Sequence, residues 1–191
     1  MNLNIKKLKS HIEDTFSLIN NDNLIDNLFK LKSKILKIKN KKKKILIIGN
    51  GGSAATASHV SVDLTKNSKV KTINFNEADF LTCFANDFGF EHMFEKALEY
   101  YCEKGDLVII LSVSGNSINL VNAAKYCIRK KIDLVTFSGN TKKNKILTLN
   151  KKNLNFFINS KAYNQVEIIH HFFLLTLVDL IIGKFKYGTN I

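Results

Sequence analysis

Gly49-Asn50-Gly51-Gly52-Ser53 follows the apolar run of residues 45–48 and precedes a helix-compatible segment that starts at Ala54. A strand, a glycine-rich turn and a helix in this order are typical of a phosphate site. Glycine lets the backbone approach an anion closely, and the first N–H groups of the helix point at it with the positive end of the helix dipole. The spacing matches neither a P-loop nor a dinucleotide fingerprint. Taken alone, the turn leaves ligand binding and a plain strand-to-helix connection equally open.

A second serine-bearing turn occupies residues 112–117, with the sequence Ser-Val-Ser-Gly-Asn-Ser. It follows the apolar run 107–111 and leads into a helical pattern over 118–129. Serine hydroxyls donate to phosphate oxygens beside the backbone N–H groups. Serine also caps helices, but three serines within six residues exceed what one cap needs. The two turns together therefore predict an anionic ligand.

The chain alternates apolar strands with helical segments. Two helices are expected within residues 3–39. Strands are expected at 45–49, 70–75, 107–113, 133–138 and 153–158, and helices at 53–66, 90–102, 117–130 and 163–183, with 142–149 as a doubtful helix. Repeated strand–helix units predict an α/β fold with a doubly wound, five-stranded parallel sheet flanked by helices. Ligands of such sheets bind beyond the carboxyl ends of the strands, where both serine-bearing turns lie.

Length and charge limit the classes of function. The 191 residues suggest one domain, with a helical extension at 1–40 and an α/β core at 41–191. The net charge of +13 raises the hypothesis of a nucleic-acid partner. The lysines, however, gather in the N-terminal helices, at 41–44 and at 142–152, without interleaved aromatic residues. We therefore expect a solvated basic surface and no nucleic-acid partner.

No segment suggests a membrane or secretion. The most apolar stretch, 172–182, is short and is interrupted by Thr176 and Asp179, and the N-terminus is polar. The chain is therefore expected in the cytoplasm, without a membrane partner. The cysteines are odd in number and form no C-x-x-C pair, so they are expected to be buried small hydrophobic side chains: Cys83, Cys102 and Cys127.

Three segments carry a resemblance to a known family: GNGGSAATASH at 49–59, ANDFGFEHMFEKAL at 85–98 and KGDLVIILSVSGNS at 104–117. The chain resembles the SIS (sugar isomerase) family, most closely its phosphoheptose isomerase (sedoheptulose 7-phosphate isomerase) branch, over most of its length. The resemblance implies the SIS fold and a homotetramer whose N-terminal helices pack between subunits. It also implies a set of phosphate- and substrate-binding residues: Asn50, Gly51, Gly52, Ser53, Asn86, Asp87, Ser112, Ser114 and Ser117. From the residues alone, Asn86 and Asp87 equally suit a turn ahead of a helix.

His59 and Asp63 are four residues apart and share one face of the first helix after the turn. Such a pair is either a surface interaction or a pair of ligands. In phosphoheptose isomerases the corresponding histidine and acid bind a divalent metal, zinc in many members, and the acid moves the proton. Asp63 is one methylene shorter than the family's glutamate, so its carboxylate reaches less far.

The closing helix departs from the family pattern, which has Gln or Glu, a histidine three residues later and a catalytic histidine eight residues later. Glu167 and His170 match the first two positions, but Leu175 occupies the third. His171 lies four residues after Glu167, on the same helix face. We expect His59, Asp63, Glu167 and His171 to converge on a divalent metal, with His171 replacing the absent group. Zinc suits these ligands, with manganese, iron or nickel left open; the alternative is that His170 and His171 merely pack in the helix.

The resemblance implies an isomerase that interconverts a ketose phosphate and an aldose phosphate through an enediol, with sedoheptulose 7-phosphate as the expected substrate. Asp63 or Glu167 would be the catalytic base, His171 the proton donor and the metal the oxyanion stabiliser. Two alternatives stay open: a catalytically lapsed SIS domain that senses a sugar phosphate, and a protein-assembly module.

Residues 168–182 are apolar nearly all round the helix, which predicts burial by the sheet on one side and by a partner chain on the other.

Overall fold

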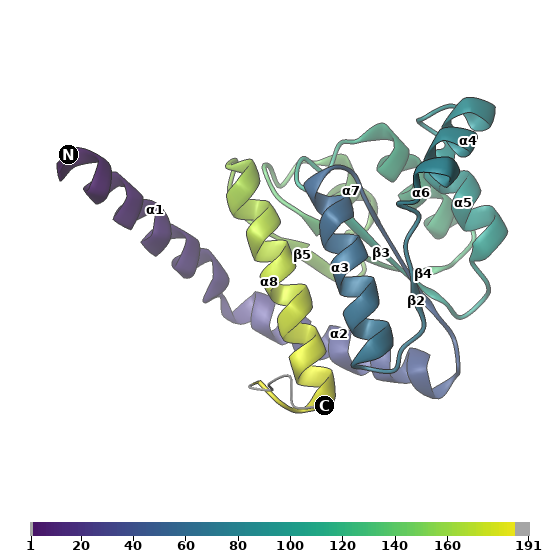
Figure 1. The fold of residues 1–191 in the computed structure, drawn as a ribbon, viewed down its shortest axis with the longest axis horizontal. Coiled ribbons are helices and arrows are strands. Elements are labelled where there is room, and N and C mark those ends of the chain that lie inside the picture. Colours follow the sequence, from purple (N-terminus) through teal and green to yellow (C-terminus); the bar gives the residue numbers. More distant parts are fainter. Residues whose placement is uncertain (1, 186–191) are drawn as a thin grey trace.

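A computed structural model describes residues 2–185, with side chains described from residue 4 onward. Its centre is a parallel sheet in the order β2-β1-β3-β4-β5 (Figure 1). The strands are β1 (Ile45–Gly49), β2 (Thr72–Ile73), β3 (Leu107–Ser112), β4 (Asp133–Ser138) and β5 (Asn155–Phe157). After β2 the chain returns to the other side of β1, so the strand order reverses between β1 and β3. Ligands of doubly wound sheets bind at such a reversal.

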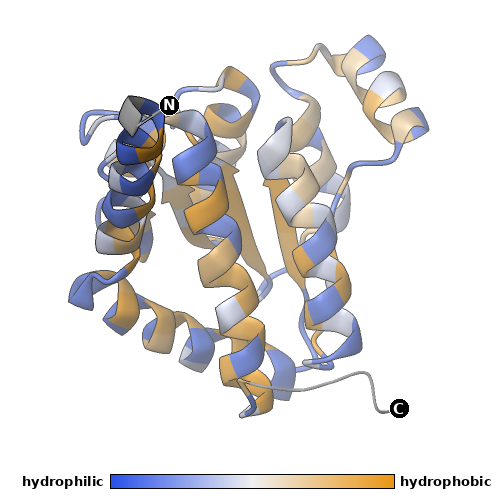
Figure 2. Cartoon of the chain, turned by 60° about the vertical axis from the view of Figure 1, so that its left-hand side comes forward, coloured by the Kyte–Doolittle hydropathy of each residue, from blue (hydrophilic) through white to orange (hydrophobic). Residues whose placement is uncertain are grey.

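Helices cover both faces of the sheet. They are α1 (Asn2–Ile19), α2 (Asp22–Asn40), α3 (Gly52–Lys66), α4 (Ala78–Phe88), α5 (Met93–Tyr101), α6 (Ile118–Arg129), α7 (Lys145–Leu149) and α8 (Tyr163–Ile182). Ile45 and Ile47 of β1 pack in a core with α2, α3 and α8, whereas Leu46 and Ile48 pack in a second core with α5 and α6. Figure 2 shows the strands as hydrophobic throughout and the helices with both polar and apolar sides. Burial on both faces explains why β1 and β3 are continuous apolar runs.

Helix α1 projects away from the body of the protein (Figure 1). Four of its large apolar side chains are strongly exposed: Ile5, Leu8, Ile12 and Phe16. A helix that exposes a row of apolar side chains at helical spacing has a face suited to burial against another surface.

The predicted fold class is confirmed, but some elements differ from the prediction. The strand expected at 70–75 is only Thr72–Ile73, because the side chains of Asn74 and Asn76 hold the following chain outside the ladder. Helix α4 was not predicted. It buries no residue fully, although Phe80, Leu81, Phe84 and Ala85 pack against the second core, and it ends at Gly89 with φ of 78°. The doubtful segment 142–149 contains α7, which Asn144 caps by accepting from the N–H of Leu147.

Burial also corrects two expectations. Cys127 is buried as predicted, but Cys102 is partly exposed and Cys83 is exposed, because Cys83 lies on the outer side of α4 with Asp87 one turn later. Helix α8 is long and apolar enough to cross a membrane by length and composition alone, contrary to expectation. Half of its apolar window is buried inside the fold, and one helix of this kind is weak evidence for a membrane span.

Candidate functional site

The two serine-bearing turns lie side by side at the carboxyl ends of β1 and β3. The pairing of Gly49 with Leu111 makes both strands end at the same level. A hollow of about 80 Å³ opens between the turns, and its lining includes Asn50, Ser53, Ser112, Ser114, Ser117 and Glu167. All four serines predicted to bind phosphate are therefore brought together.

The hydroxyls of the second turn are already oriented by its backbone. Ser112 Oγ accepts from the N–H of Gly115 and Ser114 Oγ accepts from the N–H of Asn116, both at 3.2 Å. A hydroxyl that accepts a hydrogen bond keeps its own O–H to donate. Helices α3 and α6 also begin beside the hollow, so their positive ends add to the attraction of an anion.

Helix α7 supports the second turn from behind. Gly115 has φ of 64°, and any side chain there would collide with the fully buried amide of Asn144. The N–H of Ile146 donates to the carbonyl of Gly115, and the N–H of Lys145 donates to Oδ1 of Asn116, both at 3.0 Å. The sequence predicted neither the role of Asn144 nor the support of the second turn by α7. A buried asparagine that caps a short helix looks in the sequence like any turn residue.

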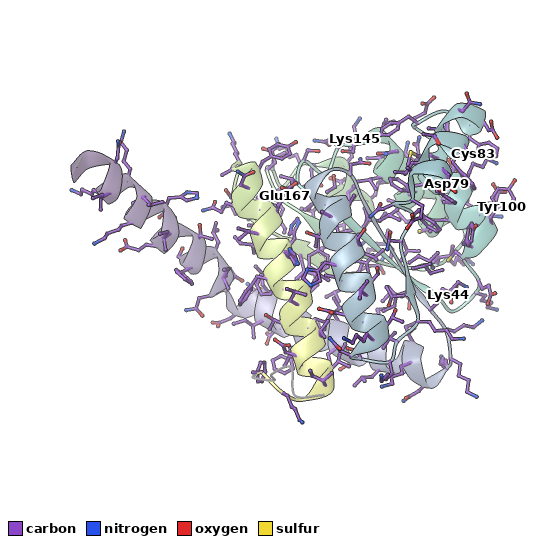
Figure 3. The ribbon with its side chains drawn as sticks, viewed as in Figure 1. Lys44, Asp79, Cys83, Tyr100, Lys145 and Glu167 are labelled. Atoms are coloured by element: carbon purple, nitrogen blue, oxygen red, sulfur yellow. The ribbon has the colours of Figure 1, made fainter. Side chains whose placement is uncertain are left out.

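Glu167 lies at the beginning of α3. A Cβ atom on Gly52 would stand 2.5 Å from Oε2 of Glu167, so a side chain at position 52 would displace this carboxylate. Figure 3 shows Glu167 on the part of α8 that lies beside α3. The helix dipole favours a carboxylate at this end, yet the same carboxylate repels an anion in the hollow. None of the described residues that line the hollow is Lys or Arg. Tyr163 also lines the hollow, and the sequence analysis did not predict it as a site residue.

One turn further along α8, His171 meets His59 of α3. Nε2 of His171 lies 3.0 Å from Nδ1 of His59, with the rings edge to face, and Nε2 of His59 lies 3.4 Å from Oδ2 of Asp63. An ionised Asp63 accepts from His59, so Nδ1 of His59 accepts from His171, and Nδ1 of His171 is left as an acceptor. Burial and the neighbouring His59 lower the pKa of His171, against an opposing effect of Asp63, so its ring is neutral at pH 7.

A divalent metal fits part of this arrangement. Two nitrogens bound to one tetrahedral zinc lie about 3.3 Å apart, near the 3.0 Å between His59 and His171. Asp63 stands behind His59 as carboxylates do behind metal-bound histidines. Glu167 lies against Gly52 instead. Within residues 2–185, no three His, Cys, Asp or Glu side chains are grouped so as to hold a metal, so the four predicted ligands do not form one cluster.

The remaining predicted residues have mixed outcomes. Asn86 and Asp87 are exposed in the last turn of α4, where Asn86 Nδ2 donates to Asp87 Oδ1, and neither lines the hollow. They belong to a helix and not to the expected loop.

His170 is buried near the carbonyl of Ser138, and burial lowers its pKa to about 4, so the alternative that His170 packs in the helix is correct. Leu175 packs against the core.

Comparison with known proteins agrees with this geometry. Residues 12–139 match the SIS domain family. The phosphoheptose isomerase of Fusobacterium nucleatum is 32% identical over 155 residues, which is 78% of each chain. That of Campylobacter concisus is 31% identical over 150 residues, covering 75% of this chain and 78% of the relative.

Solved structures show the same fold. The phosphoheptose isomerase of Neisseria gonorrhoeae superimposes with a TM-score of 0.83 at 22% identity, over 92% of this chain and 98% of that one. The enzyme of Francisella tularensis gives the same TM-score at 20% identity, over 94% and 98% of the two chains. The chain is thus a member of the SIS domain family and, within it, of the phosphoheptose isomerases.

Proposed function

We propose that this protein is an aldose–ketose isomerase that converts sedoheptulose 7-phosphate to an aldoheptose 7-phosphate. The observation that carries the proposal is the hollow between the two turns, which joins four serines to the carboxylate of Glu167. The names of the relatives support the substrate, since those proteins are phosphoheptose isomerases.

The phosphate end of the sugar would bind in the hollow. The hydroxyls of Ser53, Ser112, Ser114 and Ser117 would donate to its oxygens, beside the first N–H groups of α3 and α6. This binding energy would position the reacting carbons along the line from Glu167 to His171, which are one helical turn apart on α8.

Proton transfer then divides between two groups. Glu167 is the better placed carboxylate for removing the proton next to the carbonyl and returning it to the former carbonyl carbon, because it lines the hollow. Asp63 is held by the ring of His59 and by the amide of Asn67. The neutral ring of His171 would take a proton from the substrate hydroxyl and return it to the other oxygen as the enediol forms and collapses. This role differs from the simple proton donor that the sequence suggested.

A divalent metal, with zinc as the candidate, is part of the proposal. His59 and His171 would hold it through their facing nitrogens in place of the hydrogen bond between them, and Asp63 would orient His59. Because the neutral ring of His171 would then carry its proton on Nδ1, the proton transfer by His171 belongs to the metal-free site. When bound, the metal would stabilise the negative charge that develops on the substrate oxygen.

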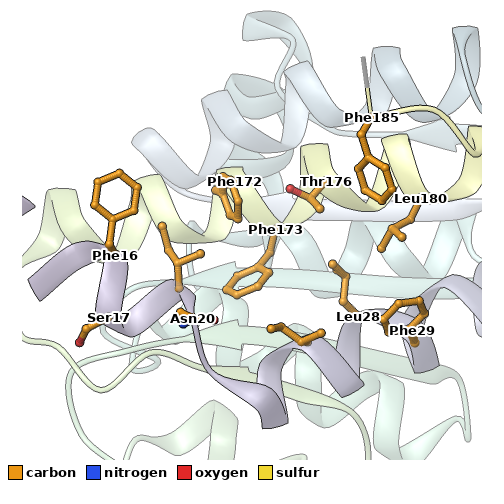
Figure 4. Close-up of a pocket in the computed structure, with 12 residues that line it drawn as sticks. Phe16, Ser17, Asn20, Leu28, Phe29, Phe172, Phe173, Thr176, Leu180 and Phe185 are labelled. Atoms are coloured by element: carbon orange, nitrogen blue, oxygen red, sulfur yellow. The ribbon is translucent and has the colours of Figure 1, made fainter. Parts of the chain in front are cut away.

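We also propose assembly into a homo-oligomer, with a tetramer as the expected state. The support is the apolar surface between α1, α2 and α8, which surrounds a hollow of about 610 Å³. Figure 4 shows Phe16 of α1 and Phe172 of α8 on this surface, with Leu28 and Phe29 of α2 nearby. A cytoplasmic location and the absence of nucleic-acid or membrane partners stay predictions of the same proposal.

The direct test is conversion of sedoheptulose 7-phosphate by the purified protein, with and without added zinc, followed by the appearance of the aldose. Turnover is the expected result. Stabilisation against heat by the sugar phosphate without turnover would instead identify a lapsed sugar-phosphate sensor. If the protein shows no turnover and no stabilisation, the protein-assembly module is the remaining alternative. Elemental analysis of the same preparation determines the metal content.

A further inference from the structure

Two asparagines join the serine-bearing turns directly. Nδ2 of Asn50 donates to Oδ1 of Asn119 at 3.0 Å, and Nδ2 of Asn119 donates to Oδ1 of Asn50 at 2.9 Å. Asn50 belongs to the turn after β1, whereas Asn119 lies in the first turn of α6, 69 residues later. The reciprocal amide pair therefore crosses from one half of the phosphate hollow to the other.

The two partners differ in exposure. Asn119 has no exposed surface and does not line the hollow, whereas Asn50 is partly exposed and does. Any effect of Asn119 on a ligand in the hollow must therefore pass through a neighbour. The neighbour with which its side chain makes a reciprocal contact is Asn50.

The backbone determines which way the pair is oriented. Oδ1 of Asn119 also accepts from the N–H of Leu120 at 2.9 Å, so this oxygen cannot exchange places with Nδ2 without setting two donors against each other. The orientation of Asn119 in turn places Oδ1 of Asn50 opposite an N–H group. The pair uses one N–H of Asn50, and its second N–H has no protein acceptor among the described residues. That second N–H is available to a ligand.

We infer that Asn119 is a positioning residue for the phosphosugar site, which acts by holding the amide of Asn50 and both turns in one arrangement. The inference rests on the proposed function, because it takes the hollow as the place of the substrate's phosphate end. It also divides the role that the sequence gave to Asn50. One side of this amide is structural, and the other side faces the ligand.

The test is a double-mutant cycle on the full chain with Asn50→Ala, Asn119→Ala and the double variant. The readouts are the Kd of inorganic phosphate and the kcat and KM of sedoheptulose 7-phosphate. Each single variant is expected to weaken phosphate binding and to lower kcat/KM by about tenfold, with most of the change in KM. The double variant is expected within about twofold of the single ones.

Additive losses, about a hundredfold in the double variant, would overturn the inference, because Asn119 would then act independently of Asn50. Asn122→Ala is the matched control on the same helix. Its amide donates to the carbonyl of Glu91, outside the hollow, and the variant is expected to keep the wild-type constants.

Asn119→Ser gives the cycle a second variant, since its hydroxyl can still accept from the N–H of Leu120. If neither replacement of Asn119 folds, the residue serves the fold alone and the inference is wrong. If the wild-type protein binds phosphate but converts no sugar, the proposed function fails while the cycle on phosphate affinity still decides the inference. If phosphate itself does not bind, both are wrong.

Discussion

Nε2 of His171 lies 3.0 Å from Nδ1 of His59, and this contact joins α8 to α3 one turn away from the carboxylate of Glu167. The two residues are 112 positions apart in the chain. Because the ring of His59 is also held by Asp63, the contact holds the neutral imidazole of His171 in one orientation against α3. The position eight residues after Glu167 holds Leu175 here, so His171 is the histidine of α8 that faces α3.

Replacing His171 by Ala should therefore remove most of the activity. We expect kcat to fall by about 10² to 10⁴ with a small change in KM, because a proton-transfer group is lost while the phosphate contacts stay. Steady-state kinetics with sedoheptulose 7-phosphate measure both constants. His92→Ala is the control, since His92 pairs with Glu95 on α5, away from the hollow. Unchanged turnover in His171→Ala would exclude this histidine from the reaction.

Glu167→Gln should separate binding from catalysis. The amide keeps the shape of the side chain beside Gly52 but removes a negative charge from the edge of the hollow. Inorganic phosphate should then bind about tenfold more tightly, while kcat falls at least a hundredfold because the base is lost. Calorimetry measures the first effect and kinetics the second. Equal or weaker phosphate binding would show that the carboxylate does not act on the anion.

Gly115→Ala should damage the second turn. The positive φ costs an alanine about 1 to 2 kcal/mol, and the new methyl group also collides with Asn144. Gly183→Ala is the matched control, because Gly183 has φ of 76° with open space around it. Both variants should lose stability in urea, but only Gly115→Ala should also lose phosphate affinity. Similar affinities in the two variants would contradict the support of this turn by α7.

Asp106 should make stability depend on acid pH. It is buried just before β3, where its carboxylate binds the side chain of Lys44 at 2.7 Å and the backbone N–H groups of Lys44 and Glu103. Burial alone would raise the pKa of Asp106, but these hydrogen bonds lower it below its usual value. Its contribution is therefore complete above the unfolded-state pKa of about 4 and is lost as the pH falls through the lower folded-state pKa.

The corresponding variant is Asp106→Asn, which we expect to lower the free energy of unfolding by about 2 kcal/mol at pH 7. The difference from the wild-type protein should shrink as the pH falls from 4 towards 2, as urea titrations at each pH would show. Asp133→Asn is the control, since the pair of Asp133 with Lys34 is exposed and should change stability by less than about 1 kcal/mol. If the difference in unfolding free energy between the variant and the wild-type protein did not depend on pH, the charge of Asp106 would contribute nothing to stability.

Phe16→Glu should disrupt the proposed oligomer. Phe16 is 66% exposed on α1 and lines the hollow shared with α2 and α8, so a charge there would be buried by a partner chain. Light scattering after size-exclusion chromatography should show a smaller species than for the wild-type protein. Ile128→Glu on α6, where Ile128 is 42% exposed, should leave the mass unchanged. A wild-type monomer would contradict the oligomer itself.

The sequence alone determined the fold class and the place where the two serine-bearing turns meet. Both depend on local patterns: apolar runs that must be buried on two faces, and glycine and serine at the points where those runs end. Two elements differed from the prediction. Helix α4 was missed although Phe80, Leu81, Phe84 and Ala85 pack on the core at helical spacing, and β2 is a two-residue strand that asparagine side chains terminate. In β2, contacts between segments override the local pattern.

Only the tertiary structure decided how the polar side chains pair. Asn50 could be read as a ligand group from its place in the turn, but its partner Asn119 is set by the neighbouring positions of β1 and β3. Glu167 was expected beside the histidines and lies at Gly52 instead, because the packing of α3 against α8 brings it there. Periodicity states which residues share a helix face, whereas the register between helices determines what that face meets.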